Sequence, residues 1–229
     1  MSESVNEEIK ENVKKALAGM TFSEKCKYLY GYYKIPALVT IVIVAAIVVT
    51  IYTIATKKDT VFQLAVVNSS SDYDYASFIE EFGNTIEYDH EKEEVLVDSS
   101  YALNVGASAN GFDSQAFQKL FAATATGQLD IIIADEETFK WIAKMGYFRN
   151  LENVMSEDDL TEYGDRLLTV AVETEDGVFD ELSGIEITDS PAVTEGNWYD
   201  SDKRVYVGIV LESETIDNDI SFIRYLDRK

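Results

Sequence analysis

The longest apolar stretch of the chain runs from Ala37 to Ala55 and contains no charged residue. At 1.5 Å of rise per residue, a helix of this length reaches about 28 Å, close to the hydrocarbon thickness of a bilayer. The pattern therefore predicts a transmembrane helix over residues 35–56. Two other interpretations are a buried core helix and the apolar region of a cleavable signal peptide.

The residues within and before this stretch favour an uncleaved span. A core helix normally has a polar face, whereas this stretch offers only Thr40, Thr50 and Thr53, whose hydroxyls can bond to the helix backbone. The apolar region of a signal peptide usually has about 7 to 15 residues and follows a short N-terminus. Here 34 residues precede the span. The chain is thus predicted to cross the membrane once.

Residues 1–34 are predicted to form cytoplasmic amphipathic and juxtamembrane helices. Apolar residues recur every four positions in residues 3–18, which indicates a weak amphipathic helix. Thr21 and Glu24 have the spacing of a capping box, so a second helix is expected to begin there. Its aromatic residues suit the membrane interface, although a partner-binding helix is the alternative. Pro36 fits the first turn of the span, where a backbone amide has no partner.

After Lys58 the pattern changes to short apolar runs separated by amphipathic stretches. Strands are predicted at 61–67, 95–97 and 129–134, with an extended piece at 101–105, and helices near 74–82, 113–127 and 136–145. The last third predicts strands at 167–172, 184–188 and 204–211 and a closing helix at 217–226. Because strand and helix alternate, we expect an α/β domain over residues 57–229, with flanking helices on a parallel or mixed sheet.

The charge is distributed unevenly along the chain, whose net charge is -23. Residues 1–34 hold six Lys and five Asp or Glu, whereas residues 59–229 hold 11 Lys or Arg and 37 Asp or Glu, a net charge of -26. Nucleic-acid binding requires clustered cations that neutralise phosphates, so no nucleic-acid partner is expected. The acidic surface suits solubility, and a specific cationic partner is the alternative.

The lysines beside the span predict its orientation. Lys25, Lys27 and Lys34 precede it, whereas only Lys57 and Lys58 follow it closely. Positive residues concentrate on the cytoplasmic side, so we expect a single-pass protein of the cell membrane, with a cytoplasmic N-terminus and an extracytoplasmic C-terminal domain. The single cysteine, Cys26, precedes the span. The C-terminal domain therefore cannot form an internal disulfide.

The residue types argue against catalysis, and neither a metal site nor a cofactor is expected. The single histidine, His90, lies in a polar run that reads as an exposed turn, so a Ser-His-Asp triad and a multi-histidine zinc site both lack support. The loop from Gly106 to Gly111 has no Walker lysine. Asp72, Asp74 and the acidic residues near 158–165 lack the EF-hand pattern and fit helix capping better than calcium binding. A carboxylate-dependent hydrolase is a remote alternative.

The candidate ligand-binding site is placed by a fold rule. In open parallel sheets, ligands bind at the carboxyl ends of the strands. The residues expected there are Asn68, Ser69, Ser70, Ser108, Asn110, Asp135 and Glu136. Trp198 and Tyr199 are predicted to add an aromatic wall. Asn68-Ser69-Ser70 also fits a glycosylation sequon, although a turn after a strand explains the same residues.

The segment from Gly127 to Phe139, with its continuation from Gly146 to Leu151, resembles bacterial extracytoplasmic solute-binding proteins of ABC transporters. Residues 205–209 followed by 220–226 look like the return strand and helix of that family. Tyr32-Tyr33-Lys34 before the span is similar to a group of single-pass bacterial membrane proteins. Members of the solute-binding family hold ligand between two lobes, whereas about 170 residues here suffice for one lobe.

The resemblance implies one lobe of a periplasmic-binding-protein-like fold, held at the membrane by a helix in place of a lipid anchor. We expect a membrane-tethered binding or interaction module without catalytic activity. The alternative is a small-solute receptor or accessory subunit of an ABC transporter. The expected partners are the lipid bilayer and a membrane or transporter protein, and the resemblance leaves open whether a small molecule binds.

Overall fold

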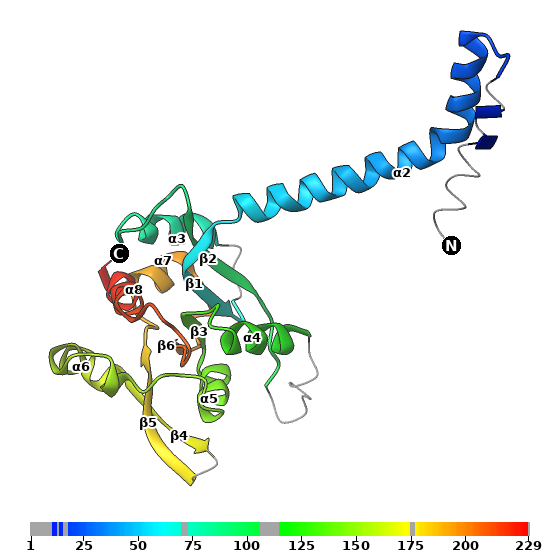
Figure 1. The fold of residues 1–229 in the computed structure, drawn as a ribbon. Helices are drawn as coiled ribbons and strands as arrows, with labels where there is room; N and C mark the ends of the chain where they lie inside the picture. Colours follow the sequence, from blue (N-terminus) through cyan, green and yellow to red (C-terminus); the bar gives the residue numbers. More distant parts are fainter. Residues whose placement is uncertain are drawn as a thin grey trace. The chain divides into compact units, whose positions relative to one another are not determined.

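The computed structural model describes residues 11–12, 14–15, 18–69, 73–105, 115–174 and 177–228. The chain divides into two units between Lys57 and Lys58. The N-terminal unit contains the apolar helix, and the C-terminal unit contains a sheet and its covering helices (Figure 1). The two units are described separately below.

The apolar stretch forms part of one helix, α2 (Phe22–Thr56). Its portion from Lys34 to Thr56 is long and apolar enough to cross a membrane, and none of it is buried. This exposure disagrees with the alternative of a buried core helix. A membrane anchor and a signal sequence near the N-terminus are both compatible with such a helix.

The expected break between a juxtamembrane helix and the span is wrong, because α2 is continuous through Pro36. Proline has no amide to donate, and its ring displaces the carbonyl one turn earlier, so a helix bends there. Figure 1 shows this bend in the first half of α2. The helix begins as predicted, with the Thr21 amide donating to the Glu24 carboxylate at 2.9 Å. Thr40 and Thr50 donate to carbonyls one turn earlier, as expected.

The C-terminal unit contains a mixed sheet of six strands in the order β2-β1-β3-β6-β5-β4. The parallel half comprises β1 (Asp59–Val67), β2 (Glu93–Tyr101) and β3 (Ile131–Asp135). The antiparallel half comprises β6 (Val205–Ile209), β5 (Gly177–Glu186) and β4 (Leu167–Thr174). The prediction of an α/β domain is thereby confirmed, and crossover connections apply only to its first half.

Helices cover both faces of the sheet (Figure 1). One face packs against α3 (Tyr75–Gly83), α7 (Pro191–Gly196) and α8 (Ile216–Arg228). The other face packs against α4 (Gln115–Ala125) and α5 (Glu136–Lys144). Leu64 and Val66 point into the first cluster, and Ala65 and Val67 into the second. This double burial explains why β1 is apolar almost without interruption.

Several elements differ from the sequence prediction. β2 is one strand over 93–101, and residues 102–105 are not extended into a second one. Its polar residues follow from its place at the edge of the sheet. β5 begins at Gly177 rather than 184, because it forms a hairpin with β4 whose far end is largely exposed. Four short elements were not predicted, because their sequences are polar and lack a clear apolar periodicity. They are α6 (Glu157–Tyr163), α7 and the 3-10 turns Leu151–Asn153 and Gly164–Arg166.

Candidate functional site

The carboxyl ends of β1 and β3 lie side by side, because the register pairs Val66 with Ile133. Asn68 follows β1 in a left-handed conformation, with φ of 59°. Its Nδ2 lies 3.2 Å from Asp135 Oδ2 and 2.9 Å from both Thr138 Oγ1 and Leu103 O. Its Oδ1 accepts the Leu103 amide at 2.7 Å. The predicted pair Asn68 and Asp135 is therefore brought together.

Tyr199 bridges the same two strands near their carboxyl ends. Its hydroxyl lies 2.6 Å from the carbonyl of Val67 and 3.2 Å from that of Ile133. Burial raises the pKa of this phenol well above its usual range, and the nearby Tyr75 and Asp135 add to the effect. Tyr199 thus stays a neutral donor that closes the carboxyl ends of the two strands.

Trp198 was predicted to add an aromatic wall to the candidate site, but its side chain is fully buried and offers no surface to a ligand. Its ring packs 4.9 Å from Phe78, 5.1 Å from Tyr75 and 5.7 Å from Tyr73, measured between ring centroids. Ser69 donates to the Trp198 carbonyl at 3.1 Å and also bonds to the Tyr75 hydroxyl. Trp198 is buried because it follows the end of α7 and packs into an aromatic cluster of the core.

Asp135 and Glu136 both belong to the start of α5. Asp135 caps the helix by accepting the Thr138 amide at 3.2 Å. Glu136 pairs with Lys140 one turn later and with Arg204 at 3.2 Å. The hydrogen bond from Lys140, followed by the charge of Arg204, lowers the pKa of the Glu136 carboxyl. Both carboxylates have hydrogen-bond or ion-pair partners inside the protein.

A surface pocket of about 410 Å³ opens beside these carboxylates. Its lining mixes both signs of charge: Asp135, Glu136, Glu137, Lys140, Asp202, Lys203 and Arg204. The prediction from sequence included two of the acidic residues and missed the three cations. One signal was available for Lys140, since Glu136 and Lys140 have the four-residue spacing of a helical ion pair. Lys203 and Arg204 come from a distant segment that only the fold brings close.

Three predicted binding residues, Ser70, Ser108 and Asn110, lie outside the described residues. Among the residues that the structure describes, no group of three or more His, Cys, Asp or Glu could hold a metal ion. Asp74 caps α3 by accepting the Ser77 amide at 3.1 Å, as the capping interpretation predicts. His90 lies on an exposed turn, with its ring 4.1 Å from that of Tyr88.

The arrangement has two chemically different parts. The polar groups at the ends of β1 and β3 bond to one another and hold the sheet edge closed. The adjacent pocket presents carboxylates, ammonium groups and a guanidinium to solvent, which suits a small charged or zwitterionic molecule. Whether the predicted residues bind a ligand stays a prediction.

A scan of protein-family models, a search of curated proteins and a search of solved structures each find no match to this chain.

Proposed function

We propose that this chain is a membrane-tethered, extracytoplasmic binding or interaction module without catalytic activity. The observation that carries the proposal is the pairing of an unburied, membrane-length apolar helix with a separate, strongly acidic α/β unit. An apolar helix of this length is stable in a bilayer, where its backbone groups are bonded internally. The lysines before the span support a cytoplasmic N-terminus.

The resemblance to one lobe of a solute-binding protein supports a role in binding. Near the strand ends, the polar residues that the structure describes support the same role, since they serve as caps and cross-links. An acidic exterior disfavours adhesion to an anionic lipid surface. A protein partner in the same membrane suits a domain that is held close to the bilayer.

Cysteine labelling tests the tethering and its orientation. Cys26 is the single cysteine and is exposed. In intact cells, a membrane-impermeant maleimide should leave Cys26 unlabelled until the cells are permeabilised. A Cys26→Ser, Ser99→Cys variant moves the thiol to an exposed position on β2, and it should react without permeabilisation. The reverse pattern contradicts the orientation, and recovery of the protein in the soluble fraction contradicts the tether.

A small-solute receptor is the second candidate function, and the mixed-charge pocket favours it. Arg204 and Lys203 suit a carboxylate, whereas Glu137 and Asp202 suit an ammonium group, so an α-amino acid or short peptide matches the lining better than a neutral sugar. The same pocket lies beside the strand ends where ligands gather in open α/β sheets.

Thermal shift measurements on the full chain in detergent test this candidate. Amino acids and dipeptides at millimolar concentration should raise the melting temperature, because a ligand that binds only the folded state stabilises it. Lys203→Ala should abolish the shift, whereas Lys119→Ala, which lies on α4 away from the pocket, should retain it. A flat response to every amino acid, dipeptide and sugar contradicts the receptor and leaves the interaction module in place.

A further inference from the structure

A second cluster of polar residues lies where α8 begins and where β3 starts. Asp219 is fully buried, and Asp130 is 7% exposed. The hydroxyl of Ser213 lies between them, 2.6 Å from Asp219 Oδ2 and 2.9 Å from Asp130 Oδ1. Thr215 Oγ1 lies 3.0 Å from Asp130 Oδ1 and 3.4 Å from Asp219 Oδ1. The cluster belongs to neither the strand-end network nor the pocket.

The hydrogens in this cluster can be counted. Ser213 carries one hydroxyl hydrogen, yet its oxygen lies within hydrogen-bond distance of two carboxylate oxygens. An ionised carboxylate only accepts, so one of the two contacts would lack a hydrogen if both aspartates were charged. A proton on one carboxyl group supplies the missing hydrogen. The two short contacts then become a chain of two donated bonds.

The surroundings decide which aspartate carries the proton. Asp130 accepts the Gln63 amide at 2.8 Å and the hydroxyls of Ser213 and Thr215, so three donors support its charge. Asp219 has no comparable set and is the more buried of the two. We propose that Asp219 and Asp130 form a buried proton-binding site, in which Asp219 donates its proton to Ser213 and Ser213 donates to the Asp130 carboxylate.

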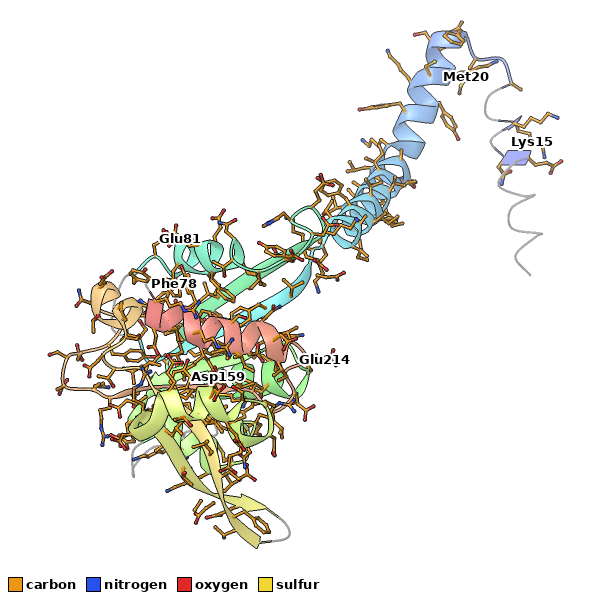
Figure 2. All side chains as sticks on the ribbon, turned by 90° about the vertical axis from the view of Figure 1, so that its left-hand side faces the viewer. Lys15, Met20, Phe78, Glu81, Asp159 and Glu214 are labelled. Atoms are coloured by element: carbon orange, nitrogen blue, oxygen red, sulfur yellow. The ribbon has the colours of Figure 1, made fainter. Side chains whose placement is uncertain are left out.

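Most of the nearby charged groups favour a proton on Asp219. Arg149 is the exception, since its charge lowers the pKa of Asp219, but its Nη2 donates to the carbonyls of Ser213 and Leu211, and no ion pair joins it to Asp219 among the described residues. Glu214, labelled in Figure 2, is exposed on the same loop and adds negative charge. On α8, Asp217 is exposed, and on β1 the group facing the cluster is the neutral Gln63 amide. Burial, with the charge of Asp130, raises the pKa of Asp219 to about 8.

The site makes folding pH-dependent in a defined direction. The pKa of Asp219 is higher in the folded chain than in the unfolded chain, so its contribution to stability is complete below about pH 4 and is lost as the pH rises towards 8. Across that interval, the ratio of folded to unfolded protein should fall by up to about tenfold per pH unit on account of this group. The hydrogen bonds that this proton completes link the loop before α8 to the start of β3.

Urea unfolding of the full chain in detergent tests the site. Both tryptophans, Trp141 and Trp198, belong to the C-terminal unit, so their fluorescence reports its unfolding. Between pH 5 and 8.5 the wild-type midpoint should decrease. Asp219→Asn, which mimics the protonated acid, should lose this part of the decrease and exceed wild type at pH 8.5. Asp217→Asn changes an exposed carboxylate in the same turn and should follow wild type.

Two further measurements identify the protonated group. Asp130→Asn should destabilise the fold at every pH in this interval, because the amide nitrogen, which cannot accept, would then face either the Gln63 amide or the hydroxyls of Ser213 and Thr215. Equal pH dependence in wild type and Asp219→Asn overturns the proposal. Infrared spectroscopy of the wild type avoids any folding defect of the variants: the carbonyl band of a protonated carboxyl group should be present at pH 7 and absent at pH 10. Its absence at pH 7 overturns the proposal as well.

Discussion

At the scale of single residues, Asn68 is the centre of the strand-end network. Its side-chain amide lies within hydrogen-bond distance of four groups, and its φ is positive, a conformation that asparagine tolerates better than most residues. The neighbouring partners Asp135, Thr138 and the Leu103 backbone lose a contact when the amide is removed. The side chain of Asn68 therefore holds three segments of the chain together.

We expect Asn68→Ala to destabilise the C-terminal unit by about 2 to 4 kcal/mol, since buried partners are left unpaired and alanine is strained at this φ. Urea unfolding followed by tryptophan fluorescence measures the loss. Asn197→Ala is the matched control, because Asn197 also has a positive φ, of 47°, but its side chain makes no hydrogen bond to the residues that the structure describes. A loss at Asn197 as large as that at Asn68 contradicts the role of the network.

Gly184 lies on β5 where the backbone comes close to the ring of Phe139 and to β6. A Cβ at this position would overlap the ring of Phe139 and lie 3.0 Å from the Val207 carbonyl. Phe139 is itself held by Phe148, whose ring stacks on it with centroids 4.4 Å apart. The ring therefore has little room to move.

Gly184→Ala should cost about 1 to 3 kcal/mol, the usual range for overpacking a core. The paired variant Gly184→Ala, Phe139→Leu should lose less stability than the sum of the two single variants, because leucine vacates the space that the methyl group needs. Chemical denaturation of the four proteins measures this coupling. Additive losses contradict the overlap of the methyl group with the ring.

Residue-scale chemistry was only partly predictable from the sequence. The proximity of Asn68 and Asp135 was predicted because the carboxyl ends of parallel strands meet at one edge of a sheet, whatever side chains follow them. The proton site was missed, since Asp130, Ser213 and Asp219 are separated by up to 89 positions (219 - 130) and no short motif links them. Trp198 was misplaced because a polar segment around it suggested exposure, whereas its own ring fills the interior.

At the scale of elements, α8 is tied to the segment around α6 by two ion pairs. Arg224 donates to both oxygens of Asp159, with Nη2 distances of 2.6 and 2.7 Å (Figure 2, where Asp159 is labelled). Arg166 and Asp227 form a second pair, also with two bonds. The hydrogen bond from Ser156, and then the Arg224 contact, lowers the pKa of Asp159.

Asp159→Asn should lower stability by about 1 kcal/mol at pH 7, because the pair with Arg224 is partly open to solvent. A carboxyl group with a lowered pKa stabilises the fold above its unfolded pKa of 3.8, and this contribution is lost as the pH falls further. The deficit of the variant should therefore shrink as the pH is lowered from 7 to below 3.8. Asp158→Asn, at the exposed neighbouring position, should match wild type in urea titrations across this pH range.

Element prediction succeeded where periodicity is strong and failed where tertiary pairing decides. The apolar runs of β1, β3 and β6 and the amphipathic faces of α3, α4, α5 and α8 follow from their patterns alone. The exposed half of β5 has no apolar alternation to detect, because its strand structure depends on pairing with β4. The continuity of α2 through Pro36 was missed for a local reason, since proline usually marks a helix boundary.

At the scale of the whole molecule, the two units differ in what holds them together. The C-terminal unit has apolar clusters on both faces of its sheet, and these clusters contain residues from 62 to 226 only. The described part of the N-terminal unit contributes no residue to either cluster. The fold of the C-terminal unit therefore rests on its own core, without a disulfide and without the apolar helix.

We expect a fragment of residues 58–229 to be soluble and folded. Its urea midpoint should agree with that of the full chain in detergent, because every buried residue of the two clusters is retained, and Trp198 should keep the fluorescence of a fully buried indole. A fragment that aggregates or shows no cooperative unfolding contradicts the independence of the two units.

Raising the salt concentration from about 0.05 to 0.5 M should increase the urea midpoint of the fragment, since screening weakens the repulsion within a unit of net charge near -26. A midpoint that falls with salt contradicts the dominance of charge repulsion.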